Sequence, residues 1–101
     1  MAYELVLLPR AQHGFEEIVR YLAVDLASPQ AAGHFVDEFE RKTELLCENL
    51  CLYGLSRIPE IAARGYRPMP ILRYVALYSV RENLMVVAHI FHQSQDHARY
   101  V

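Results

Sequence analysis

Residues 71–92 read I71-L-R-Y-V-A-L-Y-S-V-R-E-N-L-M-V-V-A-H-I-F-H92, and this stretch decides the fold. Up to residue 80 the side chains alternate between two faces, which is the period of a β-strand. One of these faces would hold Leu72, Tyr74, Ala76, Tyr78 and Val80. Residues 81–83 predict a tight turn, and residues 84–91 are nearly all apolar, as in a central strand covered on both faces. The stretch therefore predicts a β-hairpin.

The residues before this hairpin predict one strand and two helices. Tyr3–Leu8 fits a short strand, which Pro9 ends by removing a backbone donor. Apolar residues at helical spacing predict a first helix from about Pro9 to Ala27, in which Gly14 costs roughly 1 kcal/mol relative to alanine. Ser28-Pro29 is a typical helix start and predicts a second helix that ends near residue 50. A short joint between two amphipathic helices predicts an antiparallel helical hairpin.

The connection from Cys51 to Pro70 is rich in glycine, proline and arginine. It predicts a short helical turn within Ile58–Arg64 and a brief edge strand at Gly65–Met69, because Pro68 cannot donate in a central strand. The predicted order is β-α-α-β-β-β, with the helical hairpin packed on a small, mainly antiparallel sheet. We expect one α+β domain over residues 1–101.

The formal net charge of −2 argues against a dedicated nucleic-acid binder, which needs an excess of cations for phosphate contacts. Lys42 is the only lysine, and the other nine basic residues are arginines, five of which lie within 25 positions from Arg57 to Arg81. Most of the acidic residues come earlier, on the predicted helices. The chain is thus divided into an acidic helical half and an arginine-bearing half.

No chemical motif points to a cofactor, a metal or a membrane. The spacing of Cys47 and Cys51 would suit a redox or metal pair, but we expect two small apolar residues on one inner helix face. His13 and His34 lie on different helices without the carboxylate spacing of a metal site. No Gly-rich phosphate loop, and no apolar run near the ~18 residues that span a bilayer, is present. We expect a cytoplasmic protein that uses no cofactor and binds no metal or membrane.

Four stretches together point to a known family. They are L8-P9-R10-A11 at the end of the first strand, S28-P29-Q30-A31-A32 at the start of the second helix, G65-Y66-R67-P68-M69 before the hairpin, and the paired strands at 74–80 and 83–92 that lead to Asp96. With these features the chain resembles the RelE/ParE superfamily of toxins from bacterial type II toxin–antitoxin systems, and its ParE branch most. The resemblance spans almost the whole chain.

The resemblance implies a plasmid-stabilisation-type toxin that a cognate antitoxin neutralises. RelE-like members cleave messenger RNA on the ribosome, whereas characterised ParE-like members inhibit DNA gyrase. His92 and Asp96 match the His-x-x-Arg-Asp ending of related members, with Gln95 in the place of the arginine. Val75 stands where the RelE nucleases carry an arginine, and their lysine cluster is absent. The last two differences argue against RNA cleavage, and they leave a ParE-like protein that acts by binding as the favoured interpretation.

Three residues are the catalytic candidates if the protein is a nuclease. His92 would be the acid or base, and Arg67 and Arg73 would stabilise the charged phosphorane. His89 and His92, three positions apart on a strand, should point to opposite faces, so we expect His89 to be a core or edge histidine. The alternative for the two arginines is surface pairing with the acids of the second helix.

Five residues are the candidates for binding the target or the antitoxin: Arg67, Arg73, Tyr78, His92 and Asp96. Tyr78, like Tyr74, is also consistent with packing that leaves its hydroxyl at the rim. A groove or an open sheet edge would admit the antitoxin as a helix or an added strand. Three functions remain open: a gyrase-binding toxin, a ribosome-dependent ribonuclease acting on mRNA, and a non-toxic homologue that binds an antitoxin. Assembly into a homodimer, or into a heterotetramer with the antitoxin, is also open.

Overall fold

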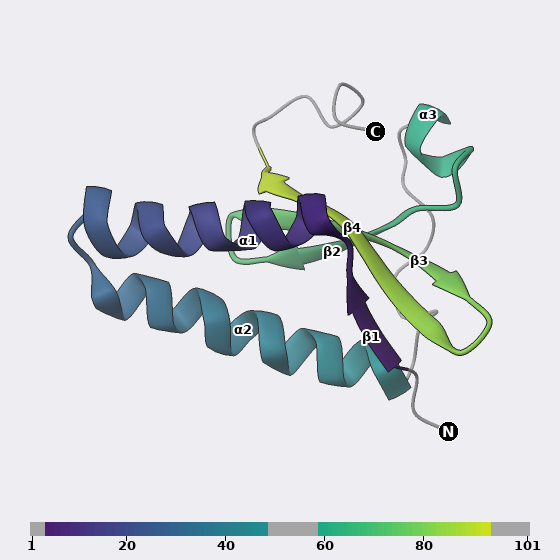
Figure 1. Ribbon diagram of the computed structural model, residues 1–101, viewed down its shortest axis with the longest axis horizontal. Helices are drawn as coiled ribbons and strands as arrows, with labels where there is room; N and C mark the ends of the chain where they lie inside the picture. The colour runs from purple at the N-terminus through teal and green to yellow at the C-terminus, as the bar shows by residue number, and fades with distance from the viewer. Residues whose placement is uncertain (1–3, 49–58, 94–101) are drawn as a thin grey trace.

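The computed structural model of the protein describes residues 4–48 and 59–93. The elements are β1 (Glu4–Leu7), α1 (Pro9–Arg20), a π-helical turn (Tyr21–Asp25), α2 (Pro29–Glu48), α3 (Pro59–Ala62), β2 (Arg67–Ile71), β3 (Tyr74–Arg81) and β4 (Leu84–His92). α1 and α2 form an antiparallel hairpin over one face of a single sheet (Figure 1). The predicted α+β fold and its β-α-α-β-β-β order are confirmed, with the expected short helix as α3.

The four strands lie in the order β1-β4-β3-β2. β3 pairs antiparallel with both β2 and β4, whereas β1 pairs parallel with β4, so the sheet is mainly antiparallel as predicted. β1 covers only the first half of β4, from Leu84 to Val87. A β-bulge follows, because Tyr78 lies opposite Val87 while Leu77 lies opposite His89.

Three predicted boundaries differ from the structure. The edge strand before the hairpin spans Arg67–Ile71 rather than Gly65–Met69. The strand does not begin at Leu72, whose φ of 56° is left-handed and places it in the turn between β2 and β3. The first helix is α-helical only to Arg20 and continues as the π-helical turn to Asp25. The predicted start of the second helix is confirmed, since the Ser28 Oγ accepts a hydrogen bond of 3.2 Å from the backbone N–H of Ala31.

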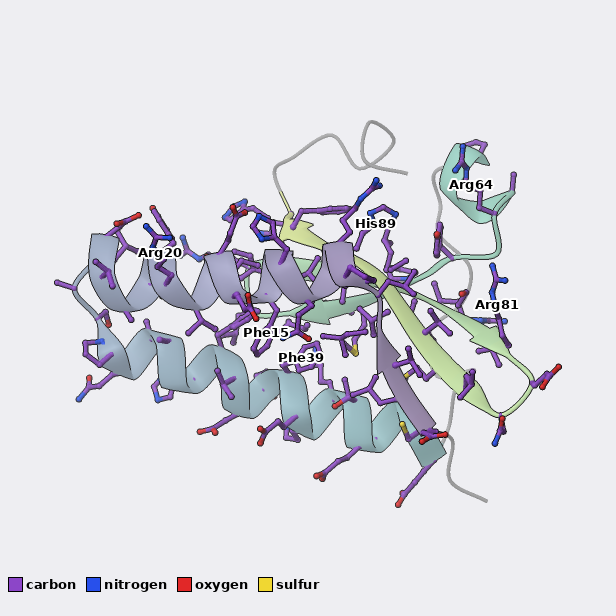
Figure 2. The ribbon with its side chains drawn as sticks, viewed as in Figure 1. Phe15, Arg20, Phe39, Arg64, Arg81 and His89 are labelled. Carbon is purple, nitrogen blue, oxygen red and sulfur yellow. The ribbon has the colours of Figure 1, made fainter. Side chains whose placement is uncertain are left out.

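The main core lies between the helices and the sheet. Phe15 of α1 and Phe39 of α2 meet between the helices with ring centroids 4.9 Å apart (Figure 2), and Phe35 packs edge-on against Tyr74 of β3. Seven successive residues of β4 are buried, which confirms that this strand is covered on both faces. Leu77 and Phe91 form a smaller cluster on the sheet face away from the helices.

Gly14 brings α1 into close contact with the backbone of β4. A Cβ atom built on Gly14 would lie only 2.8 Å from the carbonyl oxygen of Ile90. The glycine that weakens the helix prediction is therefore what lets the helix lie against the strand. Across residues 4–48 and 59–93, no helix is long and apolar enough to cross a membrane.

Candidate functional site

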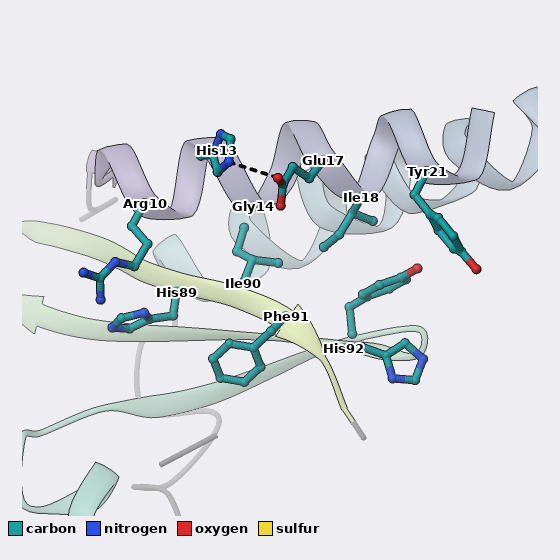
Figure 3. Close-up of a pocket in the computed structure, with 11 residues that line it drawn as sticks. Arg10, His13, Gly14, Glu17, Ile18, Tyr21, His89, Ile90, Phe91 and His92 are labelled. Carbon is teal, nitrogen blue, oxygen red and sulfur yellow. Dashed lines mark ion pairs between the residues drawn. The ribbon is translucent and has the colours of Figure 1, made fainter. Parts of the chain in front are cut away.

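A groove of about 460 Å³ opens between α1 and the second half of β4, and we call it the α1–β4 groove (Figure 3). Its lining consists of Arg10, His13, Gly14, Glu17, Ile18, Tyr21, Tyr74, His89, Ile90, Phe91 and His92. The groove is thus lined by three histidines, one arginine and two tyrosines, together with a few apolar side chains. Such a mixture of apolar surface and convergent polar groups is typical of a binding site.

The groove exists because β1 is shorter than β4. The backbone N–H of Leu8 donates a 3.0 Å hydrogen bond to the carbonyl oxygen of Val87, and Pro9 then begins α1. Beyond Val87, β4 continues to His92, and on the side away from β3 it has α1 rather than a strand beside it. Residues of α1 and of the end of β4 therefore line the same space.

His92 and Tyr74 form one end of this groove. Their rings meet edge-on with centroids 5.3 Å apart, and the two residues lie opposite each other in the β3–β4 register. Burial raises the pKa of the Tyr74 phenol, and the nearby phenol of Tyr21 raises it further. Tyr74 is therefore a neutral hydroxyl near neutral pH, able to donate or accept a hydrogen bond.

His89 faces away from the helices, opposite Leu77, whereas His92 pairs with Tyr74 on the helix side. The prediction that the two histidines point to opposite faces is confirmed. The imidazole of His89 is buried, with Tyr66 edge-on at a centroid distance of 5.7 Å. Burial lowers its pKa, and the positive charges of Arg10 and Arg64 lower it further, so the ring is neutral at pH 7.

The helix side of the groove carries an ion pair. His13 Nε2 and Glu17 Oε1 are 3.0 Å apart, one turn apart on α1, and both side chains are well exposed to solvent. Such an exposed pair contributes little to stability. Its significance is the carboxylate that it places in the groove, about two helical turns beyond Arg10.

The structure brings together only two of the three catalytic candidates. The backbone N–H of Gln93, next to His92, donates a 3.0 Å hydrogen bond to the carbonyl oxygen of Arg73, so His92 and Arg73 belong to the same end of the sheet. Arg67 lies opposite Tyr78, four residues along β2 from the pair formed by Ile71 and Tyr74. At the rise of a β-strand, four residues correspond to roughly 13 Å.

Tyr78 requires a correction. Its side chain is 0% exposed and belongs to the main core, so it does not contact a target or an antitoxin as predicted. The reason is its position in the middle of β3, on the face that the helices cover. Asp96, Gln95 and Cys51 lie outside the described residues, so their predicted roles remain predictions.

The sequence missed Arg10 and Tyr21 as groove residues. Both lie on α1 or directly after it, and their position beside β4 depends on the parallel pairing of β1, which no local pattern indicates. The available signal was Gly14, since a glycine inside a helix often marks a close approach. No group of His, Cys, Asp and Glu side chains suited to a metal ion occurs in residues 4–48 or 59–93.

Comparison with known proteins places this geometry in a family. A solved structure from the chromosomal ParDE TA system of P. aeruginosa is similar to the chain, with a TM-score of 0.70 at 18% sequence identity, over 90% of this chain and 96% of that chain. At that identity the likeness establishes the fold alone. A comparison with curated protein sequences gave no match. The family model described as the ParE toxin of the type II toxin–antitoxin system parDE matches residues 5–97, and the chain therefore belongs to the ParE toxin family.

Proposed function

We propose that this type II toxin component is neutralised by a cognate antitoxin in the cytoplasm and acts by binding DNA gyrase, as characterised ParE-like toxins do. The α1–β4 groove is the surface that we assign to macromolecular binding. It combines aromatic, cationic and hydrogen-bonding side chains, which are enriched where proteins recognise other proteins.

The observation that favours binding over RNA cleavage is the separation of Arg67 from His92. An acid or base and the donors that stabilise the phosphorane must surround one phosphate, within hydrogen-bond distance of it. Arg67 lies on β2, roughly 13 Å along the sheet from the level of His92. Val75, in the place of the arginine of RelE nucleases, supplies no cation. The set of candidate nuclease residues is therefore incomplete at the end of the sheet that holds His92.

Exposed apolar side chains next to the groove also support a protein partner. Tyr21, Val24 and Leu26 lie at the tip of the helical hairpin, and Val24 is 66% exposed. Tyr21 belongs to the groove as well, so the apolar tip and the groove form a continuous surface. An apolar patch of this kind on a small domain is typical of an interaction surface.

Induced expression in bacteria tests the proposal through two readouts, a DNA-damage reporter and the integrity of messenger RNA. We expect growth arrest with an induced DNA-damage response and intact transcripts. Tyr21→Ala should weaken the arrest, whereas Arg81→Gln, at the other end of the β3–β4 hairpin, should leave it unchanged. Cut transcripts without DNA damage would instead support the ribonuclease, and normal growth would support a homologue that only binds an antitoxin.

A further inference from the structure

Apolar side chains gather on the surface at the hairpin tip, where the first helix gives way to α2. Seven large hydrophobic side chains are exposed in residues 4–48 and 59–93, and three of them fall within the six positions from Tyr21 to Leu26. Val24, between these two residues, is the most exposed of the seven. The tip is the end of the hairpin that lies away from the sheet (Figure 1). Apolar side chains exposed together on a small domain are typical of an interaction surface.

Backbone hydrogen bonds hold the hairpin tip in its conformation. The N–H of Leu26 donates a 3.0 Å hydrogen bond to the carbonyl oxygen of Tyr21, and the N–H of Ser28 donates one of 3.0 Å to that of Leu22. The π-helical turn also ends the buried ridge of α1, because Leu22 is 9% exposed whereas Leu26, four positions later, is 53% exposed. A hydrogen-bonded backbone therefore presents the apolar side chains, which lowers the entropic cost of binding a partner.

One charge of each sign accompanies these apolar residues. Arg20 is the last residue of α1, Asp25 is the last residue of the π-helical turn, and both are exposed. Figure 2 shows Arg20 near the end of the hairpin that lies away from the sheet. Within residues 4–48 and 59–93, neither Arg20 nor Asp25 forms an ion pair. The hairpin tip therefore offers a partner one cation and one carboxylate, with Tyr21 and Val24 between them in the sequence.

We propose that the hairpin tip binds a second copy of this chain, with Tyr21, Val24 and Leu26 of the two copies packed about a two-fold axis. Such an axis brings the same surface of both copies together, so that surface must be complementary to itself. A patch with one cation and one carboxylate meets this requirement, because Arg20 of each copy can face Asp25 of the other. The dimer is inferred from the hairpin tip alone and does not rest on the function proposed above.

A second copy fits the hairpin tip better than a nucleic acid or a strongly charged protein does. Phosphate contacts need an excess of cations, whereas the charges of Arg20 and Asp25 cancel. A protein surface of one sign would place a like charge against one of these two residues. The contact is small beside that of a permanent dimer, which buries about 2,000 Å² or more. We therefore expect a weak, reversible dimer with a dissociation constant on the order of 10–1,000 μM.

Sedimentation equilibrium of the purified protein from about 10 μM to 1 mM tests the self-association. We expect the average mass of the parent protein to rise with concentration toward that of a dimer. Val24→Glu should weaken the dimer about tenfold or more, because it places a carboxylate in the apolar contact. Val80→Glu is the matched control, since Val80 is also exposed but lies near the end of β3, away from the tip, and should leave the association unchanged. A parent protein that is monomeric at 1 mM, or equal effects of the two variants, would overturn the proposal.

Exchanging the two charges tests the two-fold pairing. Arg20→Asp leaves two carboxylates at the tip and Asp25→Arg leaves two guanidinium groups, so each variant alone should associate more weakly than the parent protein. An equimolar mixture of the two variants should associate at least as strongly as the parent, because each carboxylate then faces a guanidinium. The double variant Arg20→Asp/Asp25→Arg should associate like the parent.

Two results would refute the second copy as the occupant of the hairpin tip. One is a failure of both the mixture and the double variant to recover the association. The other is a monomeric parent protein whose affinity for its antitoxin falls in Val24→Glu but not in Val80→Glu, which would assign the tip to the antitoxin. Because sedimentation uses the isolated protein, the absence of gyrase inhibition would refute the proposed function and leave the dimer standing.

Discussion

At the scale of single residues, Gly14 sets the distance between α1 and β4. Alanine there would gain helix propensity, but its Cβ would lie 2.8 Å from a backbone oxygen that cannot move aside cheaply. We expect Gly14→Ala to lower the free energy of unfolding by about 1–3 kcal/mol, since overpacking outweighs propensity. Gly33 is the matched control, because nothing lies within 4 Å of its Cβ position.

Gly33→Ala should raise the free energy of unfolding by about 0.5–1 kcal/mol, because it gains propensity without a clash. Chemical denaturation of both variants in urea provides the comparison. Equal stabilisation by the two alanines would mean that α1 does not approach β4 at Gly14.

His89 predicts a dependence of stability on pH. Its folded pKa lies below the ordinary value of 6.5, mainly because of burial and further because of Arg10 and Arg64. The unfolded state therefore binds the proton more readily, so the contribution of His89 is fully present above pH 6.5 and is lost as the pH falls through the lowered folded value. We expect the free energy of unfolding to fall less with decreasing pH in His89→Phe, which keeps an aromatic ring, than in the parent protein. The same dependence of the free energy of unfolding on pH in both proteins would contradict a lowered pKa for His89.

At the scale of elements, β2 is an edge strand closed to further strands. Pro68 and Pro70 have no backbone N–H, and the outward carbonyl of Pro70 accepts a hydrogen bond from Lys42 Nζ of α2. Prolines and lysines at an edge are known means of preventing strand addition. The only lysine of the chain thus helps to close this edge of the sheet.

Pro68→Thr/Pro70→Thr should open the β2 edge. The two new N–H groups would face outward, where a strand of another molecule could accept their hydrogen bonds. We expect more self-association than in the parent protein, rising with concentration in analytical ultracentrifugation, and no such rise for Pro29→Ala at the start of α2. Identical sedimentation of the double variant and the parent would show that the prolines do not close the edge.

Several elements could be predicted from the sequence because their signals are local. The alternation before residue 80, the apolar run at 84–91 and the Ser28-Pro29 helix start all appear where expected. The left-handed turn at Leu72 and the π-helical turn after Arg20 were missed, because a leucine at positive φ is rare and no sequence pattern marks a π-helical turn. The predicted binding role of Tyr78 is wrong for a related reason. The alternation showed which side chains share a face with Tyr78, but it did not show that the helices cover this face.

At the scale of the whole molecule, the site depends on a contact between β1 and β4, which lie far apart in the sequence. Glu4 pairs with Leu84, and this parallel pairing places the first turn of α1 beside the end of β4. His92 was predicted as a site residue because it ends a strand, but its groove partners come from residues 10–21. Their association could not be inferred from local periodicity, because it follows from the order β1-β4-β3-β2.

The same arrangement supports the proposal that this ParE-family protein acts by binding. The helical hairpin covers one face of the sheet, and the α1–β4 groove continues into the apolar hairpin tip at Tyr21. A surface built from several segments positions side chains for a large partner, whereas the candidate nuclease residues are spread along the sheet.

The most direct measurement is DNA supercoiling by purified gyrase in the presence of this protein. The account predicts inhibition by the parent protein and by Arg81→Gln, and inhibition about tenfold weaker by Tyr21→Ala, since an exposed aromatic residue at the centre of an interface carries much of its affinity. Full supercoiling at saturating concentrations of the parent protein, together with cleavage of messenger RNA on ribosomes, would contradict it.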